Sequence, residues 1–159
     1  MAGRDPERLG ALVLDALLRS GCRGIVATGW GGMKPQALPE QVFALSEAPH
    51  EWLFPRVAAV VHHGGAGTTA AGLRAGKPSV ICPFFADQPF WGRQVHRLGA
   101  GPEPIAQNRL TSERLAQAIT HAVTAAALSQ AARNIQRELQ AERAIETTVA
   151  WVERWMGSR

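Results

Sequence analysis

Apolar residues first recur at helical spacing, in segment 5–21 of the chain. The recurring positions are Leu9, Leu12, Val13, Ala16 and Leu17. Asp5 is a candidate N-cap, Pro6 suits the first helical position, and Gly21 suits the end of a helix. The pattern therefore predicts that the chain opens with a helix.

Four short apolar runs follow, and each predicts a strand. They are GIVAT at 24–28, VFAL at 42–45, VAAVVH at 57–62 and SVICP at 79–83. A glycine-rich loop at 29–32 follows the first strand, and EAPHEWLFP at 47–55 predicts a turn before the third. A helix is expected to follow the glycine-rich turn at 63–69 and to end at about residue 75. Further helices are expected at about 90–98 and in two or three alanine-rich segments from 111 onward.

Strands that alternate with helices and read as nearly continuous apolar runs are typical of a parallel sheet covered on both faces. The predicted fold class is therefore α/β, with a doubly wound, Rossmann-like parallel sheet. Without an internal repeat or a linker, residues 1–159 are expected to form one domain. Such a domain normally begins with a strand, and this chain begins with a helix. We therefore expect a sheet that lacks its first strand, in a chain cut from a longer protein.

Composition narrows the function classes. Of the 159 residues, 46% are hydrophobic and 19% charged, as in an ordinary globular protein. The net charge of +4 is spread along the chain, whereas nucleic-acid binding needs a clustered basic stripe, so no nucleic-acid partner is expected. A small anionic ligand such as a nucleotide diphosphate fits this charge equally well. With no apolar run of about 20 residues and no signal peptide, we expect no membrane span and a cytoplasmic location.

The segment HHGGAGTT at 62–69 carries the candidate chemistry. A strand leads into three glycines and then into a helix, and a helix N-terminus offers unpaired N–H groups to a phosphate. His62 stands at the strand end, where it can donate a hydrogen bond and where a proton would add charge. The alternative is that the glycines only form a tight turn. The segment is neither a P-loop nor a dinucleotide-binding motif, and the two histidines have no third ligand at useful spacing, so no metal is expected.

This segment, together with GLRAGKPSVICPFFADQPFWGRQVHRLGAGPEPI at 72–105, resembles the donor-binding signature of the UDP-glycosyltransferase superfamily. The resemblance is strongest to the branch of sterol, macrolide and glycopeptide glucosyltransferases, and APHEWLFPRV at 48–57 resembles that branch's base-binding turn. These enzymes have two facing Rossmann-like domains, the GT-B arrangement. The N-terminal domain binds the acceptor and the C-terminal domain binds the nucleotide sugar, and this chain resembles only the latter.

The resemblance implies roles for individual residues. For the donor diphosphate these are His62, Gly64, Gly65, Ala66, Gly67 and Thr68. Asp87 and Gln88 take the position of an acidic–glutamine pair that binds the sugar hydroxyls. The nucleobase region comprises Trp30, Pro49, His50 and Trp52, although for each of the two tryptophans a packed-core role is favoured over lining the pocket.

The same resemblance implies an inverting, metal-independent transfer of a hexose from a UDP-sugar, or a TDP-sugar, to a hydroxyl of a lipophilic acceptor. No residue of this chain is expected to be catalytic, because the family's general base lies in the N-terminal domain. The chain is expected to be inactive alone and to need that domain or a partner chain. The alternatives are a stand-alone donor-binding subunit of a split glycosyltransferase and a non-catalytic nucleotide-sugar-binding module. The apolar segment 146–156 adds an expectation of self-association.

Overall fold

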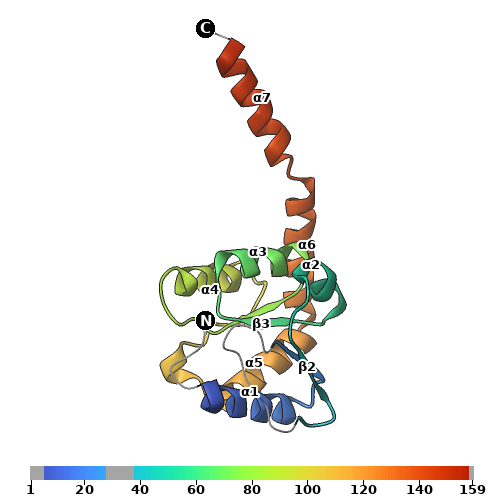
Figure 1. Ribbon diagram of the computed structural model, residues 1–159, viewed down its shortest axis with the longest axis vertical. Helices are drawn as coiled ribbons and strands as arrows, with labels where there is room; N and C mark the ends of the chain where they lie inside the picture. The colour runs from blue at the N-terminus through green and yellow to red at the C-terminus, as the bar shows by residue number, and fades with distance from the viewer. Residues whose placement is uncertain (1–5, 28–37, 158–159) are drawn as a thin grey trace.

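The computed structural model describes residues 6–27 and 38–157, and shows short parallel strands between two layers of helices. Helices α3 (Ala66–Arg74) and α4 (Gln88–Arg97) lie on one side of strand β3 (Val60–His62), and α1 (Pro6–Ser20) and α5 (Ser112–Thr124) lie on the other (Figure 1). The α/β class with parallel strands is thereby confirmed. The candidate N-cap Asp5 lies outside the described residues.

The strands form two parallel pairs. Strand β1 (Gly24–Ala27) pairs with β2 (Val42–Leu45), and β3 pairs with β4 (Ser79–Ile81). Within the described residues no backbone hydrogen bond joins one pair to the other. A doubly wound sheet has the strand order 3-2-1-4-5-6, so a sheet without its first strand would show the pairs 3-2 and 4-5. Among the described residues, β1–β2 and β3–β4 correspond to those two pairs.

Side-chain packing joins the two strand pairs instead. One cluster of buried residues draws Val26 and Val42 from the first pair and Val80 from the second, together with Leu115 and Ile119 of α5. A second cluster, on the α3 and α4 side, contains Ile81, Val95, Ala100 and Ala132. The first cluster therefore bridges the break between the strand pairs.

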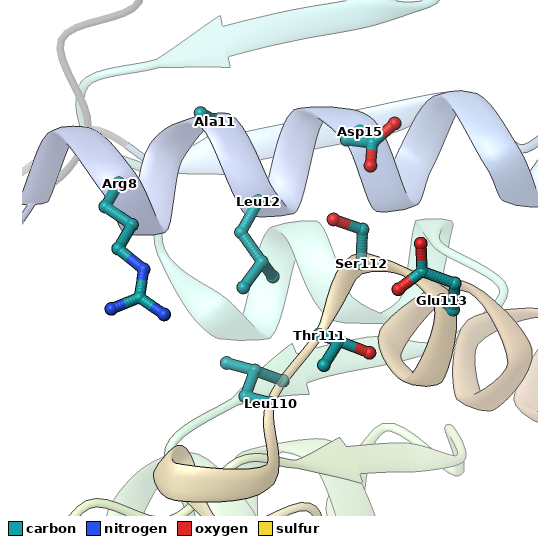
Figure 2. A pocket seen from close by; sticks show the side chains of 8 residues that line it. All are labelled: Arg8, Ala11, Leu12, Asp15, Leu110, Thr111, Ser112 and Glu113. Atoms are coloured by element: carbon teal, nitrogen blue, oxygen red, sulfur yellow. The ribbon is translucent and has the colours of Figure 1, made fainter.

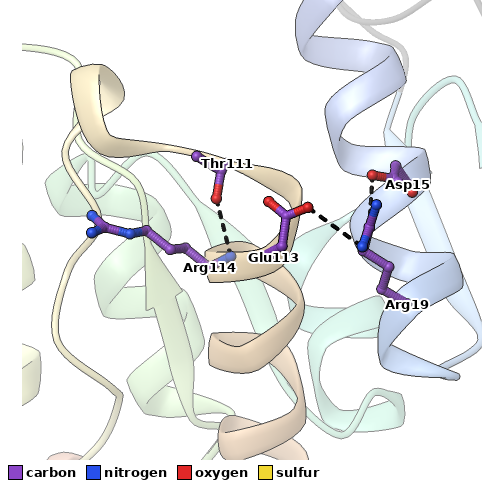
Figure 3. A network of polar contacts seen from close by, with 5 residues as sticks. All are labelled: Asp15, Arg19, Thr111, Glu113 and Arg114. Atoms are coloured by element: carbon purple, nitrogen blue, oxygen red, sulfur yellow. Dashed lines mark hydrogen bonds and ion pairs between the residues drawn. The ribbon is translucent and has the colours of Figure 1, made fainter.

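Helices α1 and α5 meet along a seam on the outer side of the first cluster. Near the helix starts the seam opens into a hollow of about 440 Å³, lined by Arg8, Ala11, Leu12, Asp15, Leu110, Thr111, Ser112 and Glu113 (Figure 2). Beside it the Arg19 side chain bridges Asp15 at 2.8 Å and Glu113 at 3.4 Å, and the Thr111 hydroxyl caps α5 by accepting from the Arg114 N–H (Figure 3). The hydrogen bond from Arg19 lowers the pKa of Asp15. Because these ionic groups are exposed, the apolar seam rather than the ion pairs holds the helices together.

Three local features differ from the sequence prediction. The predicted turn at 47–55 contains a short helix, α2 (His50–Leu53), followed by a 3-10 turn, η1 (Phe54–Arg56). Strand β3 begins at Val60 rather than at residue 57. A second 3-10 turn, η2 (Gln107–Arg109), precedes α5. A single helical turn is too short to show a hydrophobic period, which is why the pattern did not reveal it.

The chain ends in two further helices. Helix α6 (Ala126–Ala141) packs on α3, and α7 (Ala144–Gly157) projects away from the body as an arm (Figure 1). No residue of α7 is buried, so the apolar segment predicted to face water does so. None of the described helices combines the length and apolar character that a membrane crossing requires.

Candidate functional site

The turn between β3 and α3 is built around Gly64. Its φ of +91° lies in the left-handed region that favours glycine. A Cβ at Gly64 would also approach Ile81 Cγ2 to 2.7 Å and the Gln88 carbonyl oxygen to 3.0 Å. Backbone conformation and space therefore both require glycine here, and the turn lies directly against the start of α4.

The N-terminus of α3 is uncapped by any side chain. Gly65 occupies the N-cap position, and its carbonyl accepts from the Thr69 N–H at 2.9 Å. The three preceding N–H groups, of Ala66, Gly67 and Thr68, have no acceptor within the helix. Ala66 and Gly67 are exposed, and a Cβ at Gly67 would meet nothing within 4 Å. These donors therefore face open space, as a phosphate site at a helix N-terminus requires.

His62 presents a single hydrogen-bond donor to the same turn. The Gly64 N–H donates to His62 Nδ1 at 3.0 Å, which leaves the imidazole proton on Nε2. Nε2 is buried and has no partner among the described residues. Burial, with smaller contributions from the neighbouring His63 and His50, lowers the pKa of His62 to about 4. At neutral pH the imidazole is therefore a neutral donor. The positive charge that a second proton would add to His62 is absent at this pH.

Asp87 and Gln88 lie at the end of the β4–α4 loop. Ala86, just before them, has a φ of +57°, an uncommon conformation for a residue with a side chain. Gln88 is 5% exposed, and its Oε1 accepts from the N–H groups of Phe84 at 2.8 Å and Phe85 at 3.3 Å. Asp87 is exposed, and its Oδ2 accepts from the Trp91 indole N–H at 2.8 Å.

The structure brings the glycine-rich turn and this loop together. Both follow the carboxyl ends of paired parallel strands, where ligands bind in open α/β sheets. A side chain on Gly64 would touch the Gln88 backbone, and the Asp87 carboxylate raises the pKa of His63 against the larger lowering effect of burial. Residues 62–68 and 87–88 therefore form one candidate site.

The four predicted nucleobase residues differ in their surroundings. His50 starts α2, stacks on Phe54 with a centroid distance of 4.4 Å, and lies close enough to His62 to affect its pKa. Pro49 is the exposed N-cap of the same helix. Trp52 is 55% exposed, with the Arg56 guanidinium 4.6 Å from its ring centroid, so the core alternative is wrong for this residue. Trp30 lies outside the described residues.

Sequence reasoning gave Trp91 no role, although its indole N–H engages Asp87. The available signal was the spacing of four residues, which places two side chains side by side on a helix. Of the two cysteines, Cys82 is buried, which raises the pKa of its thiol to about 12. Within the described residues no three His, Cys, Asp or Glu side chains are grouped so that they could share a metal ion.

Comparison with known proteins adds the family. Residues 11–152 match the family model described as erythromycin biosynthesis protein CIII-like, C-terminal domain. A sterol 3-beta-glucosyltransferase of Arabidopsis thaliana is 50% identical over 117 residues, which is 73% of this chain and 18% of the relative. One from Cryptococcus neoformans is 41% identical over 129 residues, 72% of this chain and 8% of the relative. The chain thus spans less than a fifth of these relatives.

The solved structures that resemble this chain are also glycosyltransferases. The glycosyltransferase VinC, in complex with dTDP, is 30% identical with a TM-score of 0.67 over 75% of this chain and 30% of its own. The kitacinnamycin glycosyltransferase is 22% identical with a TM-score of 0.85 over 97% of this chain and 40% of its own, a likeness of fold. The predicted likeness to the C-terminal half of GT-B glycosyltransferases is confirmed. The chain belongs to the family of erythromycin biosynthesis protein CIII-like C-terminal domains.

Proposed function

We propose that this chain binds the donor of a glycosyltransferase that moves a hexose from a UDP-sugar to a hydroxyl group of a lipophilic acceptor. The observation that carries the proposal is the uncapped N-terminus of α3 beside the unpartnered Nε2–H of His62. Three backbone donors and one neutral side-chain donor belong to this one turn, a set that suits a diphosphate. The names of the sterol glucosyltransferase relatives support a sugar donor and a lipophilic acceptor.

In this proposal the diphosphate lies on the N–H groups of Ala66, Gly67 and Thr68, and His62 donates to one of its oxygens. The acceptor oxygen attacks the anomeric carbon, the bond from that carbon to the diphosphate breaks, and the centre inverts. The helix dipole and the His62 N–H stabilise the negative charge of the leaving group without a metal ion. Asp87 and Gln88 bind the sugar, and the turn at Pro49 and His50 meets the base.

The acceptor and the general base come from outside this chain. None of the described residues has been assigned as a base, and the chain covers 18% of a relative that bears the glucosyltransferase name. We therefore propose that the chain alone binds donor without transferring sugar. Adding [14C]UDP-glucose and a sterol to the purified chain should give no glycoside, and any measured turnover would contradict the proposal.

Calorimetric titration of UDP, with and without EDTA, tests the site. We expect binding in EDTA, and about ten- to hundredfold weaker binding by His62→Ala, because a hydrogen bond to a charged group is lost. His121→Ala, which alters an exposed histidine on α5, is the matched control and should bind like the parent. Titrating TDP alongside UDP decides the base. Strict dependence on magnesium, or equal binding by His62→Ala and the parent, would overturn the corresponding assignment.

A further inference from the structure

Three hydrogen bonds at the start of α4 fix which atoms of the Asp87–Gln88 pair can meet a sugar, and one is donated by a residue that has no assigned role. We propose that Trp91 is a positioning residue, whose indole N–H orients the Asp87 carboxylate for a sugar hydroxyl. This inference rests on the proposed function, because it assumes that the pair binds the sugar of the donor.

The Trp91 indole holds one oxygen of an exposed carboxylate. Trp91 lies one helical turn after Asp87, and its Nε1–H donates to Oδ2 at 2.8 Å. Asp87 is the N-cap residue of α4, yet its side chain makes no capping hydrogen bond. Among the described residues, the Trp91 indole is the group that donates a hydrogen bond to this carboxylate. Within the described residues no group donates to Oδ1, which leaves that oxygen to accept from a ligand. An exposed carboxylate without such an anchor would sample several rotamers.

Gln88 can only donate to a ligand, whereas Asp87 can only accept. Its Oε1 is occupied by the N–H groups of Phe84 and Phe85, and the residue is 5% exposed. Only its NH₂ group is left to meet a ligand, as a donor. The pair therefore offers one acceptor, Oδ1 of Asp87, and one donor, the amide of Gln88. That combination matches two adjacent hydroxyl groups, of which one donates and the other accepts.

The surroundings of Trp91 make it a rigid anchor. Its half-buried ring meets Phe90 edge to face, with centroids 5.2 Å apart. The next residue, Gly92, lies so close to Pro104 and Ile81 that a Cβ there would approach them to 2.9 Å and 3.2 Å. Helix α4 is therefore packed closely against the body of the protein directly after Trp91. A binding group is held best by a side chain whose own position is fixed by packing.

Calorimetry with UDP and UDP-glucose tests the proposal through Trp91→Phe, which removes the indole N–H and keeps an aromatic ring. We expect UDP-glucose affinity to fall about five- to tenfold, the cost of one oriented hydrogen bond, while UDP affinity changes less than about twofold. Trp151→Phe, the same substitution on exposed α7, is the matched control and should change neither affinity. Equal losses for both ligands would overturn the proposal.

A double-mutant comparison separates positioning from general structural support. If Trp91 acts through Asp87, Trp91→Phe should cause no further loss of UDP-glucose affinity in an Asp87→Ala background. A second, independent loss in that background would overturn the proposal. If the unaltered chain fails to bind UDP at all, the proposed function fails and this inference falls with it. If it binds UDP and UDP-glucose equally, only the sugar assignment and this inference fail.

The indole proton gives a readout that does not require the Trp91 variant to fold. In ¹⁵N-labelled parent protein the Trp91 Hε1 should exchange with solvent more slowly than the Trp151 Hε1. Asp87→Asn, which replaces the carboxylate by a weaker acceptor, should speed exchange at Trp91 and leave Trp151 unchanged. Equal exchange rates for the two indoles in the parent would show that the hydrogen bond is absent, and would overturn the proposal.

Discussion

Burial controls the protonation of His62, and the pH dependence of stability should report it. The pKa of this side chain falls from 6.5 to about 4 on folding. Between these values the unfolded chain binds more protons, so the stability present above pH 6.5 is lost as the pH falls towards 4. Moving from pH 7 to pH 5 should lower the free energy of unfolding by about 2 kcal/mol through this residue.

Urea unfolding at both pH values measures this loss. His62→Gln has no group that titrates in this range and should lose about 2 kcal/mol less than the parent over the same interval. His121→Ala should follow the parent, because that histidine is exposed. Identical pH profiles for the parent and His62→Gln would show that His62 is not buried in its neutral form.

Gln88 should separate a structural role from a binding role. Gln88→Ala leaves the N–H groups of Phe84 and Phe85 without their acceptor, and should cost about 1–3 kcal/mol of stability. Gln88→Glu keeps the accepting oxygen and removes the NH₂ donor, so it should retain more stability than Gln88→Ala and still weaken UDP-glucose binding relative to UDP. Thermal unfolding and calorimetry measure the two effects. An alanine variant as stable as the parent would refute the structural role.

At this scale the sequence indicated which residues form the candidate site, but not which hydrogen bonds their atoms make. The motif placed Asp87 beside Gln88. It could not show that Gln88 Oε1 is occupied by backbone N–H groups, because that depends on the left-handed conformation of Ala86, and alanine carries no turn signal. It also could not show that His62 is too buried to hold a proton, because solvent access depends on tertiary packing.

Two glycines of the β3–α3 turn should respond in opposite ways to the same added methyl group. Gly64→Ala places alanine at a φ of +91°, with its Cβ 2.7 Å from Ile81, and should cost about 2 kcal/mol or more of stability. Gly67→Ala meets no atom within 4 Å and lies in the first turn of α3, so it should leave stability unchanged or raise it by up to about 1 kcal/mol.

The stability of Gly67→Ala should not predict its affinity for UDP. The Gly67 methyl would occupy the open space assigned to the diphosphate, so Gly67→Ala should weaken UDP binding although the protein remains stable. Calorimetry on both variants, beside chemical unfolding, measures the contrast. Full UDP affinity in Gly67→Ala would place the diphosphate elsewhere.

Among the elements, those with strong local signals were predicted best. The first helix was predicted from its apolar period and its closing glycine, and β2 was placed at 42–45 as observed. The short helix α2 was predicted as a turn, because four residues cannot show a period. Residues 57–59 read as strand, but β3 begins only at Val60, where pairing with Ser79 begins. Strand ends are set by the partner strand, which local sequence does not contain.

For the whole molecule, the exposed arm α7 should cause association. Its apolar side chains are all exposed, at 80% for Ile145, 64% for Trp151 and 66% for Met156. A broad apolar stripe in water favours contact with another apolar surface. Light scattering should therefore show concentration-dependent growth in mass, and iodide should quench the tryptophan fluorescence of α7.

Charge on the stripe should prevent this association. Val152→Glu combined with Met156→Lys should reduce the scattering mass towards that of a monomer. Ala150→Glu, on the opposite side of α7, is the matched control and should associate like the parent. A monodisperse parent with tryptophans shielded from iodide would refute the exposed-arm prediction.

The break between the strand pairs divides the described strands into two units, β3 with β4 and β1 with β2, which contribute differently to the candidate site. His62 ends β3, residues 63–68 follow it, and residues 87–88 follow β4, so one unit carries the residues proposed to bind the diphosphate and the sugar. The other unit, β1 with β2, is tied to it by apolar packing, which resists separation but has no fixed register. Small slips between the units would therefore leave the proposed diphosphate and sugar contacts in place. Amide exchange in β1 and β2 should be faster than in β3 and β4, and a bound nucleotide should slow exchange most in the unit formed by β3 and β4.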